Sequence, residues 1–202
     1  MIRRRIISMR HTRSPRSERD RGATLLETAI VLPMLIMLAL GMAEIGFLVI
    51  DHMAIANAAR EGARVGAAAG QYTDGANTAD TLILRSVEQA VCQLENGEVT
   101  RITIFRANGA TGQVPGSAAL KNIYAAPVDG ILNCSPTGAT TFTCINSCAW
   151  TPGLRDNTLP GLDDIGVLVQ FTHDPIAGLF PFTGPMNVSD KAVMRIEPNT
   201  RG

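Results

Sequence analysis

The chain has 202 residues and no net charge at neutral pH, and 46% of its residues are hydrophobic but only 4% aromatic. The charge is unevenly placed, because residues 1–22 carry eight basic and two acidic side chains whereas residues 23–202 carry ten and sixteen. A short basic leader that lacks aromatic residues and runs into an apolar segment is not the pattern of a nucleic-acid-binding protein. About 130 residues follow the apolar region, enough for one modest domain but hardly two.

The leader, residues 1–22, ends at Gly22, and a single carboxylate, Glu27, stands five residues further on in an apolar run. This is the layout of a type IV prepilin processing site, which predicts cleavage between Gly22 and Ala23. A carboxylate at the start of a membrane span is costly unless it has a partner. We expect that partner to be the free amino group that cleavage exposes on a neighbouring subunit, so the sequence favours assembly over catalysis.

Residues 25–50 are predicted to cross a membrane as a helix, because at about 1.5 Å per residue they exceed a hydrocarbon core of roughly 30 Å. The excess of arginine before this span predicts a cytoplasmic N-terminus and an exported remainder. Pro33 predicts a helix kink, either a flexible point used on leaving the bilayer or an ordinary membrane-helix kink. Glu44 lies about 25 Å beyond Glu27 along the helix. It is expected at the opposite membrane interface, either solvated there or in contact with a basic residue of a neighbouring subunit.

The helical pattern continues beyond the span, so residues 23–70 are predicted as one long helix that ends near Gly70. Arg60, Glu61 and Arg64 share a polar face with helical spacing. Small residues recur every four positions along another face: Ala54, Ala58, Gly62, Gly66 and Gly70. Such a small-residue stripe lets backbones approach closely. Its partner is either the chain's own sheet, which we favour, or a helix of another subunit.

Residues 71–202 are predicted as one extracytoplasmic α+β domain. A helix is predicted from Asp80, as its N-cap, to about Leu94, and strands are predicted around 102–104, at 165–173 and at 188–196. Between the first two strands lies a cysteine-bearing loop, residues 107–164, which is rich in Gly, Pro, Asn, Ser and Thr. So long a connection is uncommon in a compact domain. The expected fold class is therefore α+β: a long, membrane-anchored, pilin-like N-terminal helix followed by a small antiparallel-sheet domain.

The four cysteines, Cys92, Cys134, Cys144 and Cys148, all lie on the predicted exported side. An even number in an oxidising compartment favours two disulfides, although three pairings are possible. Cys144 and Cys148 are near enough in sequence to close a small loop, which would leave Cys92 to pair with Cys134. A zinc site is not expected, because the chain has no Cys-x-x-Cys and this region holds a single histidine, His173.

No catalytic site is expected. The chain contains no Gly-x-Ser-x-Gly elbow, no His-Glu-x-x-His, no Walker loop and no spaced glycines for a dinucleotide. His173 is expected to be an exposed or hydrogen-bonded side chain at the end of a strand. We therefore expect no enzymatic activity, no cofactor, no metal and no small-molecule substrate.

Four segments, 21–27, 31–33, 41–46 and 57–64, together carry a family resemblance. In order and spacing they resemble the N-terminal signature of TadE-like proteins, minor pseudopilins of the tight-adherence (Flp) pilus machinery. The matching positions are Gly22 and Ala23 of the processing site, Glu27, Pro33, Glu44, and Arg60, Glu61, Gly62 and Arg64 of the helix motif. The resemblance implies cleavage by a dedicated prepilin peptidase, with Glu27 as the assembly carboxylate. It covers roughly the first third of the chain, and residues 107–164 do not map onto the family.

The resemblance implies a structural role in pilus biogenesis after leader cleavage. The implied partners are the membrane, the prepilin peptidase, other pilin or pseudopilin subunits and the assembly machinery. The implied location is the inner membrane, single-pass with a cytoplasmic N-terminus, and then the pilus. Two alternatives remain: signal-peptidase cleavage after Ala43 that releases a soluble protein, and an uncleaved anchor for a periplasmic interaction domain. The helix that continues across Ala43, the long basic leader and Glu27 argue against the first.

Overall fold

Two compact units share one long helix. The computed structural model describes residues 16–92, 94, 97–109, 111–135, 138–176, 178 and 184–198. The chain divides into the units Met1–Met42 and Ala43–Gly202, and helix α1 (Arg16–Ala69) passes from the first into the second. Residues 1–15 of the predicted leader lie outside the described residues.

In the first unit, α1 is apolar and open to its surroundings. Its large aliphatic side chains from Leu25 to Leu40 are 40–71% exposed. By length and composition α1 can cross a membrane, and it is the one such helix in the described part of the chain. An exposed apolar surface of this extent calls for lipid or protein neighbours. Pro33 lies inside the helix, which continues on both sides of it, and the predicted kink stays a prediction.

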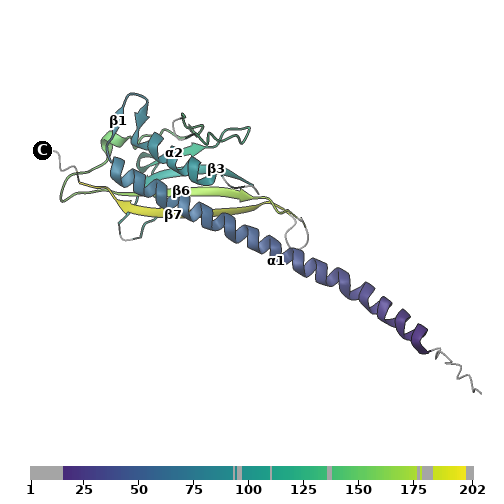
Figure 1. Ribbon diagram of the computed structural model, residues 1–202. Helices are drawn as coiled ribbons and strands as arrows, with labels where there is room; N and C mark the ends of the chain where they lie inside the picture. Colours follow the sequence, from purple (N-terminus) through teal and green to yellow (C-terminus); the bar gives the residue numbers. More distant parts are fainter. Residues whose placement is uncertain are drawn as a thin grey trace, which may run out of the picture. The chain divides into compact units, whose positions relative to one another are not determined.

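In the second unit, an antiparallel sheet has the strand order β5-β4-β3-β6-β7. Its strands are β3 (Gly97–Arg106), β4 (Lys121–Ala125), β5 (Thr143–Cys144), β6 (Asp164–His173) and β7 (Met186–Arg195). A separate small hairpin joins β1 (Thr73–Asp74) to β2 (Asn77–Thr78). The long strands β3, β6 and β7 lie side by side (Figure 1). The predicted α+β fold class, a long apolar helix followed by a small antiparallel-sheet domain, is confirmed.

The segment 107–164 is more regular than the sequence predicts. It contains β4 and β5 and two short 3-10 helices, η1 (Ala118–Leu120) and η2 (Pro152–Leu154). β4 pairs with β3 along its whole length, and β5 pairs with β4. Strands of five and two residues are too short to show a clear alternation of apolar and polar residues. The prediction of one long loop was therefore wrong at these positions, where pairing with a distant strand decides the structure.

Helix α2 spans Ala79–Val91, and its N-cap is Thr78, not Asp80. The Thr78 hydroxyl accepts a hydrogen bond from the Thr81 N–H, and the Thr81 hydroxyl accepts one from the Thr78 N–H. This reciprocal capping box satisfies two backbone donors that the helix leaves unpaired. The prediction of Asp80 as the cap was wrong, because this carboxylate is buried in the first turn and has other partners.

The core lies between one face of the sheet and the two helices α1 and α2 (Figure 1). A Cβ atom placed on Gly62 would lie 2.7 Å from Val87 of α2 and 3.3 Å from Val167 of β6. The small-residue stripe thus packs against the chain's own sheet, as the sequence favoured, and also against α2. Gly70 has a φ of +50°, which a glycine adopts readily, and its N–H still donates to the carbonyl of Gly66.

Candidate functional site

The predicted processing site lies within α1 in the first unit. Gly22, Ala23 and Glu27 are all exposed. The Glu27 carboxylate forms no hydrogen bond or ion pair with any residue that the structure describes, and apolar side chains such as Val31 and Leu35 surround it. A carboxylate in an apolar surrounding is costly unless it has a partner.

Glu44 and Asp51, seven residues apart on one face of α1, meet His173 at the end of β6. The His173 ring Nδ1 lies 2.6 Å from Asp51 Oδ2, and Nε2 lies 3.4 Å from Glu44 Oε1. The same Glu44 oxygen accepts a hydrogen bond of 3.0 Å from the N–H of Ile176. All three charged or polar side chains are at least 95% buried. This Glu44–Asp51–His173 cluster joins α1 to the far end of the domain's second long strand.

The cluster changes the interpretation of two predicted residues. One expectation for Glu44 was a solvated side chain. This was wrong, because Glu44 is 3% exposed and turned into its own domain. Its predicted contact with another subunit and its place at a membrane interface remain predictions. His173 is the hydrogen-bonded strand-end side chain that was one of its two expectations. Sequence gave no reason to pair it with α1, because more than 120 residues separate it from both carboxylates.

The helix motif at 60–64 divides between two faces. Arg64 donates two hydrogen bonds to the Glu61 carboxylate, at 2.9 and 2.5 Å, and this pairing lowers the pKa of Glu61. Arg60 donates to Asn57 at 3.3 Å. These charged side chains are exposed, so an i, i+3 pair here stabilises the helix only slightly. Gly62 points the other way, into the core, and so the motif combines a solvated charged face with a close-packing position.

The middle segment is fastened to both helices by a buried polar network around Asp80, which the sequence did not reveal. One oxygen of Asp80 pairs with the buried guanidinium of Arg155. The other accepts hydrogen bonds of 2.7 Å from the Asn122 amide and from the Tyr124 hydroxyl. Burial, and then the Asp80 carboxylate, raise the pKa of Tyr124 far above its usual value. The network therefore holds a neutral phenol, an amide and a cation around one carboxylate.

Arg155 also reaches the C-terminal end of α1. Its guanidinium donates to the carbonyl of Gly70 at 3.3 Å and lies 4.6 Å from the centre of the Trp150 ring. The backbone N–H of Trp150 donates to the Asn122 side-chain oxygen at 3.1 Å. The backbone carbonyl of Trp150 accepts from the Asn122 side-chain nitrogen at 2.8 Å. A cation at the C-terminal end of a helix interacts favourably with the helix dipole. Part of the segment predicted as a cysteine-bearing loop thus belongs to the domain's polar core.

Glu88 and two disulfides order the rest of that segment. Glu88, buried in α2, accepts hydrogen bonds from the Asn133 N–H at 2.7 Å and from the Thr141 hydroxyl at 2.5 Å. The disulfides join Cys92 to Cys134 and Cys144 to Cys148. This is the pairing that the sequence favoured among the three possible ones.

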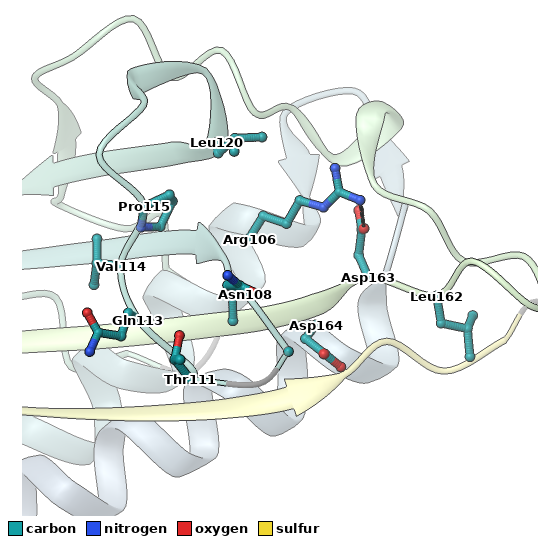
Figure 2. Close-up of a pocket in the computed structure, with 12 residues that line it drawn as sticks. Arg106, Asn108, Thr111, Gln113, Val114, Pro115, Leu120, Leu162, Asp163 and Asp164 are labelled. Atoms are coloured by element: carbon teal, nitrogen blue, oxygen red, sulfur yellow. Dashed lines mark ion pairs between the residues drawn. The ribbon is translucent and has the colours of Figure 1, made fainter.

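A hollow of about 660 Å³ lies at the end of β3 and the start of β6 (Figure 2). Figure 2 shows the Arg106 side chain turned toward Asp163. The two form an ion pair of 2.7 Å, and Arg195 of β7 pairs with Asp164 at 3.0 Å. Its other lining side chains are amides, one hydroxyl and aliphatic groups. Both carboxylates already have arginine partners, so the hollow presents balanced charge. Among the described residues, no group of three or more His, Cys, Asp or Glu side chains is placed to hold a metal ion.

Comparison with known proteins finds one similarity, which lies in helix α1. Residues 22–64 match the model of a family described as TadE-like protein. No curated protein and no solved structure matches the chain. The matched segment begins at the predicted cleavage site, includes Glu27, Pro33 and Glu44, and ends at Arg64 of the helix motif. The family match confirms the resemblance seen in the sequence: from Gly22 to Arg64 the chain is similar to TadE-like proteins.

Proposed function

We propose that this protein is a minor pseudopilin of a tight-adherence (Flp) pilus system and acts structurally in pilus biogenesis. A prepilin peptidase removes the leader between Gly22 and Ala23. The mature protein sits in the inner membrane through the apolar part of α1, with its disulfide-linked domain outside the cytoplasm, and then joins other pilin or pseudopilin subunits. The observation that carries the proposal is Glu27, an exposed carboxylate without a partner among the residues that the structure describes, five residues after Gly22 in an apolar helix.

Charge provides the mechanism. Cleavage gives Ala23 a free, positively charged amine, and Glu27 of a neighbouring subunit can pair with it. At about 4 Å and an effective dielectric constant of 20, two such charges attract by about 4 kcal/mol. The attraction is strongest where water is excluded, so it fixes the register of two helices whose apolar sides pack without preference for one position.

The orientation follows from the two ends of the chain. The eight basic residues of the leader favour a cytoplasmic N-terminus by the positive-inside rule. Both disulfides lie in the second unit, which suits an oxidising compartment on the other side of the membrane. Release after Ala43 by signal peptidase is less well supported, because Ala43 lies in the middle of the unbroken helix α1.

The first test is the N-terminus and intact mass of the protein recovered from membranes, with and without the prepilin peptidase. We expect a start at Ala23 that depends on the peptidase. A start at Glu44 would instead identify a secreted soluble protein, and an intact Met1 would identify an uncleaved anchor.

The second test is Glu27→Gln, which keeps the size of the side chain and removes its charge. We expect normal cleavage and membrane insertion but impaired pilus biogenesis, because the partner amine loses its counter-charge. Glu61→Gln is the matched control, since Glu61 lies on the same helix and pairs with Arg64 of its own chain. Normal pili in the Glu27→Gln strain would remove the proposed role of this carboxylate.

A further inference from the structure

Helix α1 turns its polar and apolar residues in unexpected directions where it enters the second unit. Between residues 44 and 53 the two carboxylates, Glu44 and Asp51, face the domain and are buried. The opposite side is formed by large apolar side chains that are 50–62% exposed. These residues are the outer face of α1: Ile45, Val49, Ile50 and Met53. His52 is the one polar side chain exposed among them. A water-soluble domain has the reverse arrangement.

The cluster with His173 makes this arrangement possible. The two ring nitrogens of His173 each face one carboxylate oxygen, so the ring contacts both Asp51 and Glu44. Glu44 is held further by the N–H of Ile176. The carboxylates therefore have partners within the domain and need no water. An unpartnered carboxylate facing hydrocarbon would cost roughly 3 kcal/mol, so the cluster removes the main obstacle to contact between this stretch and lipid.

The length of the apolar surface shows where that contact lies. From Leu25 to Met53 the helix rises by about 43 Å at 1.5 Å per residue, compared with a hydrocarbon core of about 30 Å and about 40–45 Å with the headgroup regions. Tilting the helix until all of it fitted within the hydrocarbon would require about 45°, beyond the usual range of 0–40°. The last turns of the apolar surface must then lie at the level of the headgroups.

We propose that the outer face of α1 docks on the outer leaflet of the membrane, while His173 holds the two carboxylates away from the lipid. The proposal rests on the membrane anchoring in the proposed function and adds a second contact, made by the folded domain itself. The occupant is a lipid bilayer, because the outer face continues along the helix from the segment that can cross a membrane.

The polarity beyond the outer face agrees with this occupant. After Met53 the exposed side of α1 becomes polar, with Asn57, Arg60 and the Glu61–Arg64 ion pair. A polar stretch with a basic side chain, Arg60, just outside an apolar band suits the headgroup region of a bilayer.

The test uses the full chain in vesicles of phosphatidylcholine and phosphatidylglycerol. All four native cysteines are in disulfides, so Ile50→Cys provides a single thiol for an environment-sensitive fluorophore. We expect quenching by lipids brominated near the headgroup and several-fold weaker quenching by iodide than for the same probe at Arg60→Cys. Equal iodide quenching at the two positions would overturn the proposal.

A second set of variants tests His173. His173→Asn removes the ring that contacts both Glu44 and Asp51, and we expect the probe at Ile50 to become accessible to iodide. His52→Asn, an exposed histidine on the same helix, is the matched control and should leave the probe protected. Because His173→Asn can also disturb folding, Glu44→Gln with Asp51→Asn is added to it, and this neutral triple variant should restore protection. Continued exposure in the triple variant would contradict the role assigned to the charges.

Two further readouts separate the possible failures. Flotation of the vesicles reports anchoring: if the protein does not float with them, the membrane part of the proposed function fails and this inference fails with it. If the protein floats but the probe is protected only at high protein-to-lipid ratios, the outer face is covered by another copy. In that case the lipid contact is refuted while the anchoring stands.

Discussion

Arg155→Met replaces a buried guanidinium by an apolar side chain of similar length. Asp80 then keeps its hydrogen bonds from Asn122 and Tyr124 but loses its cation, and the Gly70 carbonyl loses a donor. Removing one partner of a buried ion pair costs about 3–5 kcal/mol, because the other charge stays in a low-dielectric site. Domains of this size are stable by roughly 5–15 kcal/mol. We therefore expect Arg155→Met to remove a large share of the stability.

The companion variant makes the reasoning testable. Asp80→Asn combined with Arg155→Met leaves no charge in the network, and an asparagine can still accept from both neighbours. We expect the double variant to be more stable than Arg155→Met alone, with a coupling energy of up to about 3 kcal/mol. Urea unfolding of the full chain in detergent micelles measures this, followed by the fluorescence of Trp150, the single tryptophan, and by circular dichroism. The argument would be refuted if Arg155→Met lowered the free energy of unfolding by less than about 1 kcal/mol. It would also be refuted if the double variant were destabilised by as much as the two single variants added together.

Three other predictions follow from the core and the disulfides. Burial and a neighbouring carboxylate raise the pKa of Tyr124, so the folded chain keeps a proton that the unfolded chain loses above about pH 10. Stability should be complete below that pH and fall above it by at most about 1.4 kcal/mol per unit, and Tyr124→Phe should flatten this slope in alkaline unfolding curves. Gly62→Leu should destabilise the chain by about 1–3 kcal/mol through overpacking, whereas Gly46→Leu, where a Cβ meets nothing within 4 Å, should not, as thermal melts will show. Replacing Cys92 and Cys134 by alanine opens a loop with a sequence separation of 42, so midpoints of chemical unfolding should drop by the equivalent of about 4 kcal/mol; a drop below 1 kcal/mol would mean that Glu88 alone orders the segment.

The sequence predicted the parts of the fold that repeat along the chain. Apolar residues alternate in β6 and recur with helical spacing in α2, and both patterns are long enough to be read without knowing the partner. The small-residue stripe was readable for the same reason, since four of its five positions recur at a regular spacing within α1. β4 and β5 offered too few residues, and their place is set by β3, which lies earlier in the chain.

The polar sites were predictable only where one residue stands out from its local sequence or where the partners are close in sequence. Glu27 stands out because an isolated carboxylate in an apolar run has no local explanation. Asp80 looked like a helix cap, because caps depend on the next three residues, whereas its true partner Arg155 lies 75 positions away. His173 and Glu44 are further apart still, and no spacing rule connects them. Which charged residues pair over a long range is decided by the fold. A single sequence shows the charged residues but not their partners.

The order of the strands has a consequence for how this chain folds. β3 is central in the sheet, but its two neighbours arrive at different times: β4 follows after a short connection, whereas β6 begins only at Asp164. Contacts between segments so distant in sequence make folding slow, because the intervening chain must be ordered first. A chain that emerges from its N-terminus would expose the apolar sides of α1 and α2 until β6 reaches them. Cys92 and Cys134 both precede β6. Their oxidation ties the end of α2 to a later segment, and this shortens the loop that must be ordered before β6 can pair with β3.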